Sequence, residues 1–106
     1  MLGKVFLSYS SKDKLFVRQF DSMLRAFKVH TFLDERDIAI GEDIPQRIFD
    51  ELANSTHVMH FISSHSIKSK WVQKELSAAE MREKSGEGPA ILPILISFYT
   101  YSRKSH

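Results

Sequence analysis

The sequence contains no cysteine, which excludes a disulfide framework, a thiol nucleophile and a zinc site built on thiolates. It also lacks any apolar run near the ~20 residues that a membrane-spanning helix needs, so we expect no contact with a membrane. The opening residues 1–4 lead directly into an apolar segment, so we expect no signal peptide. Together these absences predict a protein of the reducing cytoplasm.

Few glycines and no strong excess of one charge narrow the class of protein further. The four glycines form neither a G-x-G-x-x-G nor a Walker pattern, so no nucleotide phosphate loop is expected. Fifteen Lys and Arg residues face 13 Asp and Glu residues, and a net charge of +2 is too small to favour nucleic acid as a direct partner. With 106 residues, 42% of them hydrophobic, the chain fits one small domain over residues 1–106.

Apolar patterns divide the chain into alternating strands and helices. The expected strands cover residues 4–9, 29–33, 57–62 and 90–96, and the expected helices cover residues 14–27, 44–53 and 71–84. Such alternation predicts an α/β fold with a parallel sheet, right-handed crossovers and helices on both faces. The polar segments 34–43 and 63–70 are expected to be loops. Pro93 predicts that the last strand lies at an edge of the sheet or contains a bulge.

Polar residues gather where the expected strands end. Ligands of doubly wound sheets bind beyond the carboxyl ends of the strands, and that edge carries residues 9–11, 34–35 and 63–64. The helix that begins there contains Trp71 and Glu75, which are four residues apart and therefore share one stripe of its surface. A flat aromatic surface beside a carboxylate suits a planar cationic substrate.

Three segments together resemble a TIR domain, the Toll/interleukin-1 receptor type. Residues 5–13 (VFLSYSSKD) resemble its opening strand and loop, and residues 32–44 (FLDERDIAIGEDI) resemble its BB loop. Residues 61–76 resemble the strand, loop and helix that hold the catalytic glutamate of enzymatic members. The resemblance is to bacterial and archaeal members, and it implies a three-layer, flavodoxin-like sheet of strand order 2-1-3-4.

The end of the chain departs from the family pattern. TIR domains usually continue past the fourth strand with a helix, a fifth strand and a last helix, whereas here residues 97–106 form only a tail. We therefore expect the fifth strand to be missing, in a chain that is either truncated or a minimal TIR domain. The fourth strand would then be an open edge, which is a liability for aggregation or pairing.

The resemblance implies an NAD+ glycohydrolase that cleaves the nicotinamide–ribose bond, with NAD+ as substrate and neither cofactor nor metal. It assigns the catalytic carboxylate to Glu75. The residues that it places around the substrate are Tyr9, Ser10, Ser11, Asp34, Ala39 and Trp71. Whether the product is ADP-ribose, a cyclic ADP-ribose or a base-exchange product stays open.

The resemblance also implies a biological setting. Prokaryotic immune defence against phage, activation by oligomerisation, and a fused or separate sensor domain are all features of such enzymes. Residues 34–43 would form a lid or the contact through which copies self-associate. A non-catalytic TIR domain that only binds other TIR domains in signalling is the alternative that the sequence leaves open.

Several of these residues have an ordinary structural interpretation as well. Glu75 alone would be a solvated helix glutamate, and Trp71 would cover the core. Asp13 and Asp34 fit helix caps or turns, and Ser10 fits a plain loop residue. The stripe of Phe16, Phe20 and Phe27 is expected to be core. His57 and His60 lie three apart on one strand and point to opposite faces, which makes them poor partners for a metal.

Overall fold

The computed structural model describes residues 3–86 and 88–96, with the backbone but not the side chain of Trp71. The strands are β1 (Lys4–Ser8), β2 (His30–Phe32), β3 (His57–Ile62) and β4 (Ala90–Leu95). The helices are η1 (Ser11–Asp13), a 3-10 turn, and α1 (Lys14–Ala26), α2 (Asp34–Asp37), α3 (Ile44–Asn54), α4 (Ser64–Lys68) and α5 (Lys70–Lys84). None of the described helices is long and apolar enough to cross a membrane.

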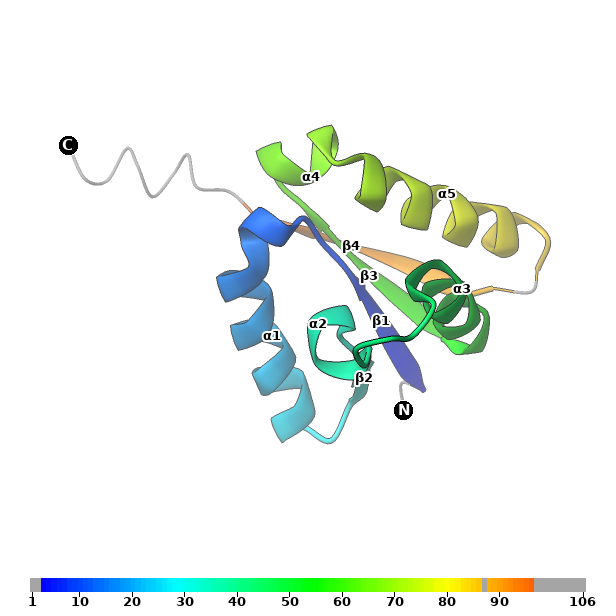
Figure 1. Cartoon of the computed structure of the whole chain (residues 1–106). Helices are drawn as coiled ribbons and strands as arrows, with labels where there is room; N and C mark the ends of the chain where they lie inside the picture. Colours follow the sequence, from blue (N-terminus) through cyan, green and yellow to red (C-terminus); the bar gives the residue numbers. More distant parts are fainter. Residues whose placement is uncertain (1–2, 87, 97–106) are drawn as a thin grey trace.

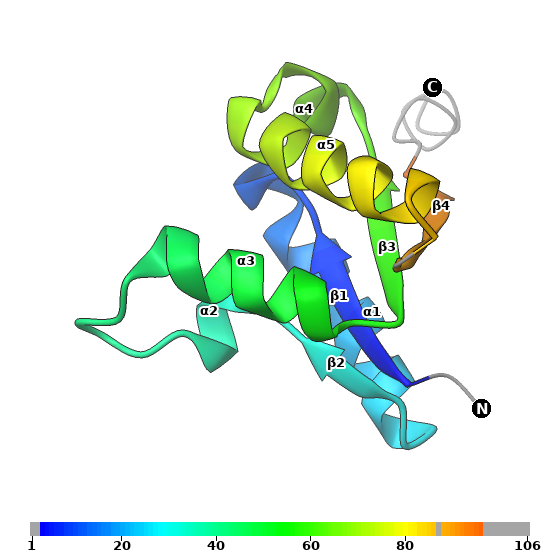
Figure 2. The ribbon, with the colours of Figure 1, turned by 90° about the vertical axis from the view of Figure 1, so that its right-hand side faces the viewer.

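The four strands form one parallel sheet of order β2-β1-β3-β4, as predicted. Helix α1 covers one face, while α3 and α5 cover the other, which gives three layers (Figures 1 and 2). The expected fold is therefore confirmed in class, strand order and layering. The predicted tail, residues 97–106, lies outside the described residues.

Strand β1 is buried on both faces because it lies inside the sheet. Val5 and Leu7 belong to the core beneath α1, whereas Phe6 belongs to the core beneath α3 and α5. The Phe6 and Phe32 rings stack at 5.2 Å between centroids. Full burial of such a side chain contributes about 2 kcal/mol, so this alternation fixes the register of the central strand.

The core face of α1 differs from the expected one. Helix α1 ends at Ala26, so Phe27 falls past its end and is 78% exposed, and Phe16 is 37% exposed. The expectation that these phenylalanines are core is wrong for Phe27. The helix instead turns Val17 and Leu24 to the sheet, with Asp21 buried between them. A charged residue in the buried stripe shifts the true face away from the one that apolar residues alone indicate.

Two segments expected to be loops contain short helices. In α4, the Ser63 side chain accepts from the amides of His65 and Ser66, and Ser66 Oγ accepts from the Ser63 amide at 2.8 Å. This is a capping box, which stabilises the start of a helix by satisfying amide donors of its first turn. In α2, the Leu33 amide donates to Asp37 Oδ2 at 2.9 Å, which closes a single turn. Side-chain caps of this kind leave no periodic signal in so short a segment.

Each outer strand, β2 or β4, pairs with another strand on one side only within the described residues. Strand β4 contains Pro93 and pairs only with β3 within residues 3–86 and 88–96, so it is an edge strand of that part of the chain, one of the two positions predicted from the proline. On the other side, β2 has three residues and pairs only with β1 in the described part of the chain.

Candidate functional site

The carboxyl ends of β1 and β2 bring Tyr9 and Asp34 together. The Tyr9 hydroxyl donates to Asp34 Oδ1 at 2.7 Å. Burial raises the pKa of the Tyr9 phenol far above its ordinary value, and the hydrogen bond and negative charge of Asp34 raise it further, with smaller contributions from Glu35 and Glu75. Tyr9 therefore remains a neutral hydrogen-bond donor at every physiological pH.

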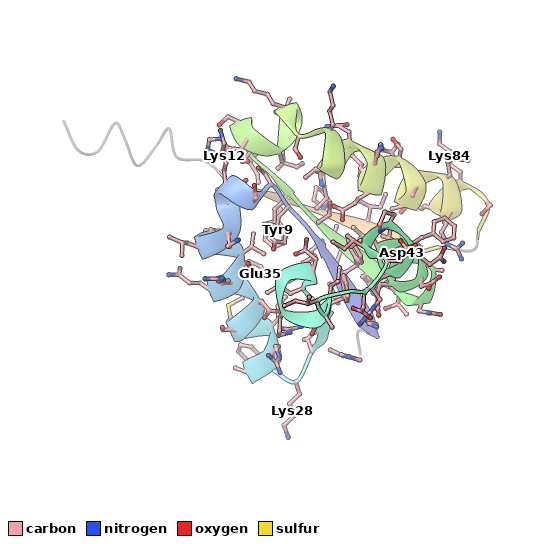
Figure 3. The ribbon with its side chains drawn as sticks, in the orientation of Figure 1. Tyr9, Lys12, Lys28, Glu35, Asp43 and Lys84 are labelled. Carbon is pink, nitrogen blue, oxygen red and sulfur yellow. The ribbon has the colours of Figure 1, made fainter. Side chains whose placement is uncertain are left out.

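A hollow of about 300 Å³ opens beside this pair, and we call it the Tyr9 hollow. Its lining consists of Tyr9, Ser11, Lys14, Asp34, Glu35 and Ser69. In Figure 3, Tyr9 and Glu35 lie near each other on the side of α1. Two carboxylates and one ammonium group make the wall predominantly anionic, which suits a cationic ring with a phosphate close by.

Salt bridges from α1 hold the start of α2 at this hollow. Glu35 pairs with Arg18 and, at 3.2 Å, with the ammonium group of Lys14. The hydrogen bond from Arg18 lowers the pKa of Glu35 below its ordinary value. Glu35 is thus charged near neutral pH, and Asp34 next to it is presented by a segment that α1 fixes in place.

Glu75 is buried beneath α5, on the side that faces the sheet. Ser69 caps the helix by accepting from the Val72 amide at 3.3 Å, and this start sets Val72, Glu75 and Ala79 toward the sheet. Only 5% of Glu75 is exposed, so the interpretation of a solvated helix glutamate is wrong. Burying a carboxylate costs free energy unless hydrogen bonds compensate it, so this position is unusual for a residue without a function.

Ser8 provides such a compensating hydrogen bond. Its hydroxyl, fully buried at the end of β1, donates to Glu75 Oε1 at 3.0 Å. Sequence reasoning missed Ser8, although a signal was present: it is a polar residue on the same strand face as Phe6, where a core side chain is expected. The bond ties the candidate catalytic carboxylate of α5 to the strand that leads into Tyr9.

Two other polar residues of this edge make hydrogen bonds that hold the loops, although the Asp13 side chain does not form the helix cap expected of it. Ser10 is 6% exposed and its hydroxyl accepts from the Lys12 amide at 3.3 Å, so it caps η1. Asp13 is buried and accepts from the hydroxyl of Ser63, which joins the loop after β1 to the loop after β3. Ser11 is exposed and lines the Tyr9 hollow together with a second hollow over η1 and α4.

The predicted residues do not all share one cavity. Ala39 is exposed further along residues 34–44, where its amide donates to Glu42 Oε2 at 2.6 Å, and it shares a shallow hollow with Asp34. Glu75 lines a separate groove between α3 and α5, which is mostly apolar. The side chain of Trp71 lies outside the described residues. Tyr9, Ser11 and Asp34 therefore form one group, with Glu75 beside them through Ser8.

No group of three His, Cys, Asp or Glu side chains in the described residues could hold a metal ion. One histidine lies beside Ser8 in the sheet: His60 of β3 pairs in register with it and is 8% exposed. Burial lowers its pKa below the ordinary value, against a smaller opposite effect from Glu80, which favours the neutral imidazole.

Residues 5–105 match the family model of the TIR domain. The chain belongs to the TIR domain family. It is 34% identical over 91 residues to the 2′ cyclic ADP-D-ribose synthase AbTIR of Acinetobacter baumannii, which covers 85% of this chain and 34% of that protein. It is 32% identical over 91 residues to the NAD(+) hydrolase PdTIR of Paracoccus denitrificans, at 85% and 30% coverage. The TIR domain thus spans about a third of the length of these curated relatives.

The solved structures confirm the fold. The TIR domains in the structure of the activated Roq1 resistosome superpose with a TM-score of 0.78 at 24% identity. This superposition covers 98% of the present chain and 64% of that one. At that level of identity the likeness concerns the arrangement of strands and helices alone.

Proposed function

We propose that this TIR domain is an NAD+ glycohydrolase that cleaves the bond between nicotinamide and ribose. The observation that carries the proposal is the buried Glu75 carboxylate, which accepts from Ser8 at the end of β1, the residue before Tyr9. Two relatives support the reaction class, since one is named a cyclic ADP-ribose synthase and the other an NAD(+) hydrolase. NAD+ acts as the substrate, and no further cofactor is needed.

The chemistry asks for little beyond a well-placed anion. Nicotinamide leaves NAD+ as a neutral molecule, taking the electron pair of the glycosidic bond, so no general acid has to protonate it. The ribose then develops oxocarbenium character, as in glycoside cleavage, and a carboxylate within reach stabilises that charge. A low-dielectric setting strengthens this stabilisation, and the burial of Glu75 supplies such a setting.

The Tyr9 hollow would hold the nicotinamide mononucleotide half of the substrate. The carboxylate of Asp34, oriented by the Tyr9 hydroxyl, attracts the cationic ring, and Lys14 is placed to meet a phosphate. We assign Ser10, Ser11, Ala39 and Trp71 to the rest of the substrate contact on the basis of family resemblance.

The product and the setting follow as parts of the same proposal. Attack by water on C1′ gives ADP-ribose, whereas attack by a group within the same substrate gives a cyclic product, and the two relatives are named for these two outcomes. We place the protein in the cytoplasm, in prokaryotic defence, with residues 34–43 as the contact through which copies assemble. A sensor domain, fused or separate, would supply the trigger.

A scaffold that only binds other TIR domains is the competing function. A scaffold has no use for a carboxylate that is 5% exposed and hydrogen-bonded to a buried serine, because that arrangement adds a desolvation cost without adding contact surface. The geometry around Glu75 therefore favours the enzyme.

The deciding experiment is incubation of the concentrated protein with NAD+, with products resolved by chromatography and mass spectrometry. Glu75→Gln should abolish nicotinamide release while the circular dichroism spectrum stays unchanged. Glu80→Gln is the matched control, because Glu80 lies on the same helix but is exposed. Release that persists in Glu75→Gln would refute the assignment of the catalytic residue, and no release from the concentrated wild type would favour the scaffold.

A further inference from the structure

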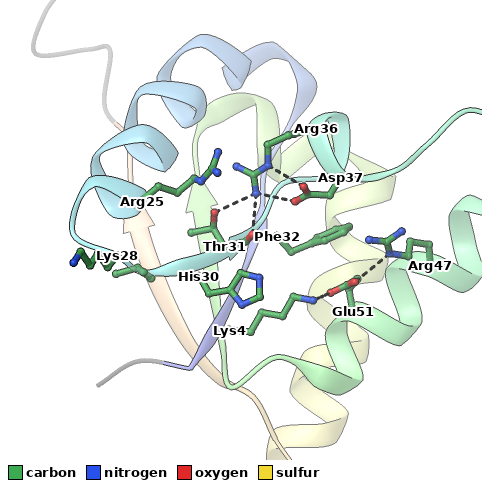
Figure 4. Close-up of a pocket in the computed structure, with 11 residues that line it drawn as sticks. Lys4, Arg25, Lys28, His30, Thr31, Phe32, Arg36, Asp37, Arg47 and Glu51 are labelled. Atoms are coloured by element: carbon green, nitrogen blue, oxygen red, sulfur yellow. Dashed lines mark hydrogen bonds and ion pairs between the residues drawn. The ribbon is translucent and has the colours of Figure 1, made fainter.

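A different hollow, of about 380 Å³, lies on the far side of α2 from the Tyr9 hollow. It runs along β2 toward the amino ends of the strands, and we call it the β2-edge hollow (Figure 4). Helix α2 forms part of both walls, with Asp34 and Glu35 on the Tyr9 hollow and Arg36 and Asp37 on the β2-edge hollow. A volume of this size accommodates a small ligand.

The lining of this hollow concentrates the positive charge of the chain. Five Lys and Arg side chains face two carboxylates, a net charge of +3 with His30 neutral. Asp21 pairs with Arg36 and Glu42 pairs with Arg47 from outside the lining, and with both carboxylates included the hollow carries +1. The lining residues that bear charge are Lys4, Arg25, Lys28, Arg36, Arg47, Asp37 and Glu51.

Three of these cations are fixed by partners of opposite charge. Arg36 contacts Asp21 Oδ2 at 2.6 Å and Asp37 Oδ2 at 2.7 Å, and Arg47 contacts Glu42 Oε1 at 2.7 Å and Glu51 Oε1 at 3.1 Å. Lys4 pairs with Glu51 as well. The Arg36 guanidinium uses its donors on Asp21, Asp37 and Thr31, whereas Nη2 of Arg47 has no hydrogen-bond partner within residues 3–86 and 88–96.

The side chains of the remaining cations, Arg25 and Lys28, have no hydrogen-bonding or ion-pair partner within residues 3–86 and 88–96. Arg25 lies in the last turn of α1 and Lys28 lies just past its end, where the helix dipole stabilises positive charge. The dipole alone explains why cations occur at this end of the helix. It does not account for their place on a concave wall opposite fixed guanidinium groups. Figure 4 shows Arg25 beside the hollow and Lys28 at its rim.

We propose that the β2-edge hollow binds a small soluble molecule that carries a phosphate or pyrophosphate group. Arg25 and Lys28 supply the charge that is not yet neutralised, and the fixed Arg47 guanidinium supplies directional donors through Nη2. The hollow is recessed, and its only apolar lining residues, Val29 and Phe32, are not exposed. A lipid bilayer would find nothing there to anchor it, so the hollow fits a free anion better than a membrane surface.

The test uses inorganic pyrophosphate as the probe. Pyrophosphate is titrated into the ¹⁵N-labelled protein at constant ionic strength, and the amide resonances of Thr31, Arg36 and Asp37 are followed. We expect these resonances to shift saturably. Arg25→Gln should weaken binding about ten-fold, the factor for one lost hydrogen bond to a charged group, and Lys28→Gln should weaken it as well. Both side chains are exposed, so both variants should fold.

The matched control is Lys84→Gln, since Lys84 is an exposed cation in the last turn of another helix, α5. It should leave the affinity unchanged. Equal weakening in Lys84→Gln, an unaltered affinity in Arg25→Gln, or no saturable shift in the wild type would each overturn the proposal. So would shifts confined to Ser11 and Lys14, which would place the anion in the Tyr9 hollow. Sedimentation with vesicles containing phosphatidylinositol phosphate, in the absence of pyrophosphate binding, would replace the soluble ligand by a lipid headgroup.

Discussion

At the scale of single residues, the proposed chemistry depends on the pair formed by Ser8 and Glu75. The two residues are 67 positions apart in the sequence, and one hydrogen bond of 3.0 Å joins them inside the core. Because both are buried, neither can exchange its partner for water without cost. The carboxylate is held in one orientation before any substrate arrives, which is what stabilisation of a developing charge requires.

Removing the serine hydroxyl tests this positioning. We expect Ser8→Ala to lower kcat for NAD+ cleavage about ten-fold, because the carboxylate loses one hydrogen bond that orients it. The free energy of unfolding should fall by about 1–3 kcal/mol, the cost of a buried polar group with one partner fewer. The measurements are steady-state nicotinamide release and urea unfolding. Ser77→Ala, on the exposed side of α5, is the control; a wild-type kcat in Ser8→Ala would contradict the role.

His60 predicts a loss of stability on mild acidification. Its pKa is lowered in the folded protein by burial, so below about pH 6.5 the unfolded chain takes up a proton that the folded chain does not. Stability should therefore fall as pH drops below that value, by at most about 1.4 kcal/mol per pH unit. Urea unfolding between pH 7.5 and 5 should show a smaller decline in His60→Gln than in the wild type. Equal declines would show that His60 is not the cause.

Residue roles were only partly accessible from the sequence. Glu75 follows from its spacing to Trp71 and from the resemblance to TIR domains, whereas its burial depends on how α5 lies on the sheet. Tyr9 and Asp34 were expected at the same edge, but their hydrogen bond depends on the one-turn helix α2. Ser8 was missed because its partner is remote in the sequence.

At the scale of elements, α2 owes its position to side chains rather than to its own length. A single turn of four residues is too short to be stable alone. Arg36 fastens it by contacting Asp21 at 2.6 Å and donating to the carbonyl oxygen of Thr31 at 2.8 Å. Asp21 lies in the buried stripe of α1 for the same reason.

Arg36→Gln should therefore loosen α2 and destabilise the fold. It leaves the carboxylate of Asp21, which is 5% exposed, without its cationic partner, and we expect a loss of about 2–3 kcal/mol in the free energy of unfolding. The double variant Arg36→Gln/Asp21→Asn should recover part of that loss, because no charge is then left unpaired. Thermal and urea unfolding of the wild type, the two single variants Arg36→Gln and Asp21→Asn, and the double variant gives the coupling energy. Additive effects would rule out this role for the pair.

Element boundaries show the same division between pattern and context. The strands and long helices were predicted to within one or two residues, because their apolar periodicity comes from burial. The turns α2 and α4 were not predicted, because caps such as Ser63 and Asp37 create them without periodicity. The displaced core face of α1 has the same origin, since Asp21 is buried by its partner and not by its own chemistry.

At the scale of the whole molecule, exposed apolar side chains are consistent with the proposed assembly. Ile40 is fully exposed within residues 34–43, the segment proposed to carry contact between copies, and Phe27 and Leu95 are also largely exposed. A monomer in dilute solution gains nothing from these groups. Burial of one such side chain between copies contributes about 1.5–3 kcal/mol.

Activity per mole of protein should accordingly fall on dilution. Ile40→Ser should shift the midpoint of that dilution curve to roughly ten-fold higher protein concentration, the factor for one lost buried side chain. The measurements are NAD+ turnover over a dilution series and sedimentation velocity of the same samples. Met81→Ser is the control, since Met81 is equally apolar and 73% exposed but lies on α5. A specific activity that is constant over the series would contradict dependence on assembly.

Helix α2 lies between the two hollows and would couple the two ligands proposed for them, NAD+ and the phosphate anion. An anion that draws Arg36 away from Asp21 would shift a turn whose first residue orients the Tyr9 hydroxyl at the other side. Linkage makes such an effect reciprocal. By whatever factor the anion changes the affinity for NAD+, NAD+ changes the affinity for the anion by the same factor. If both proposals hold, the level of phosphate compounds changes the concentration of NAD+ at which the domain becomes active.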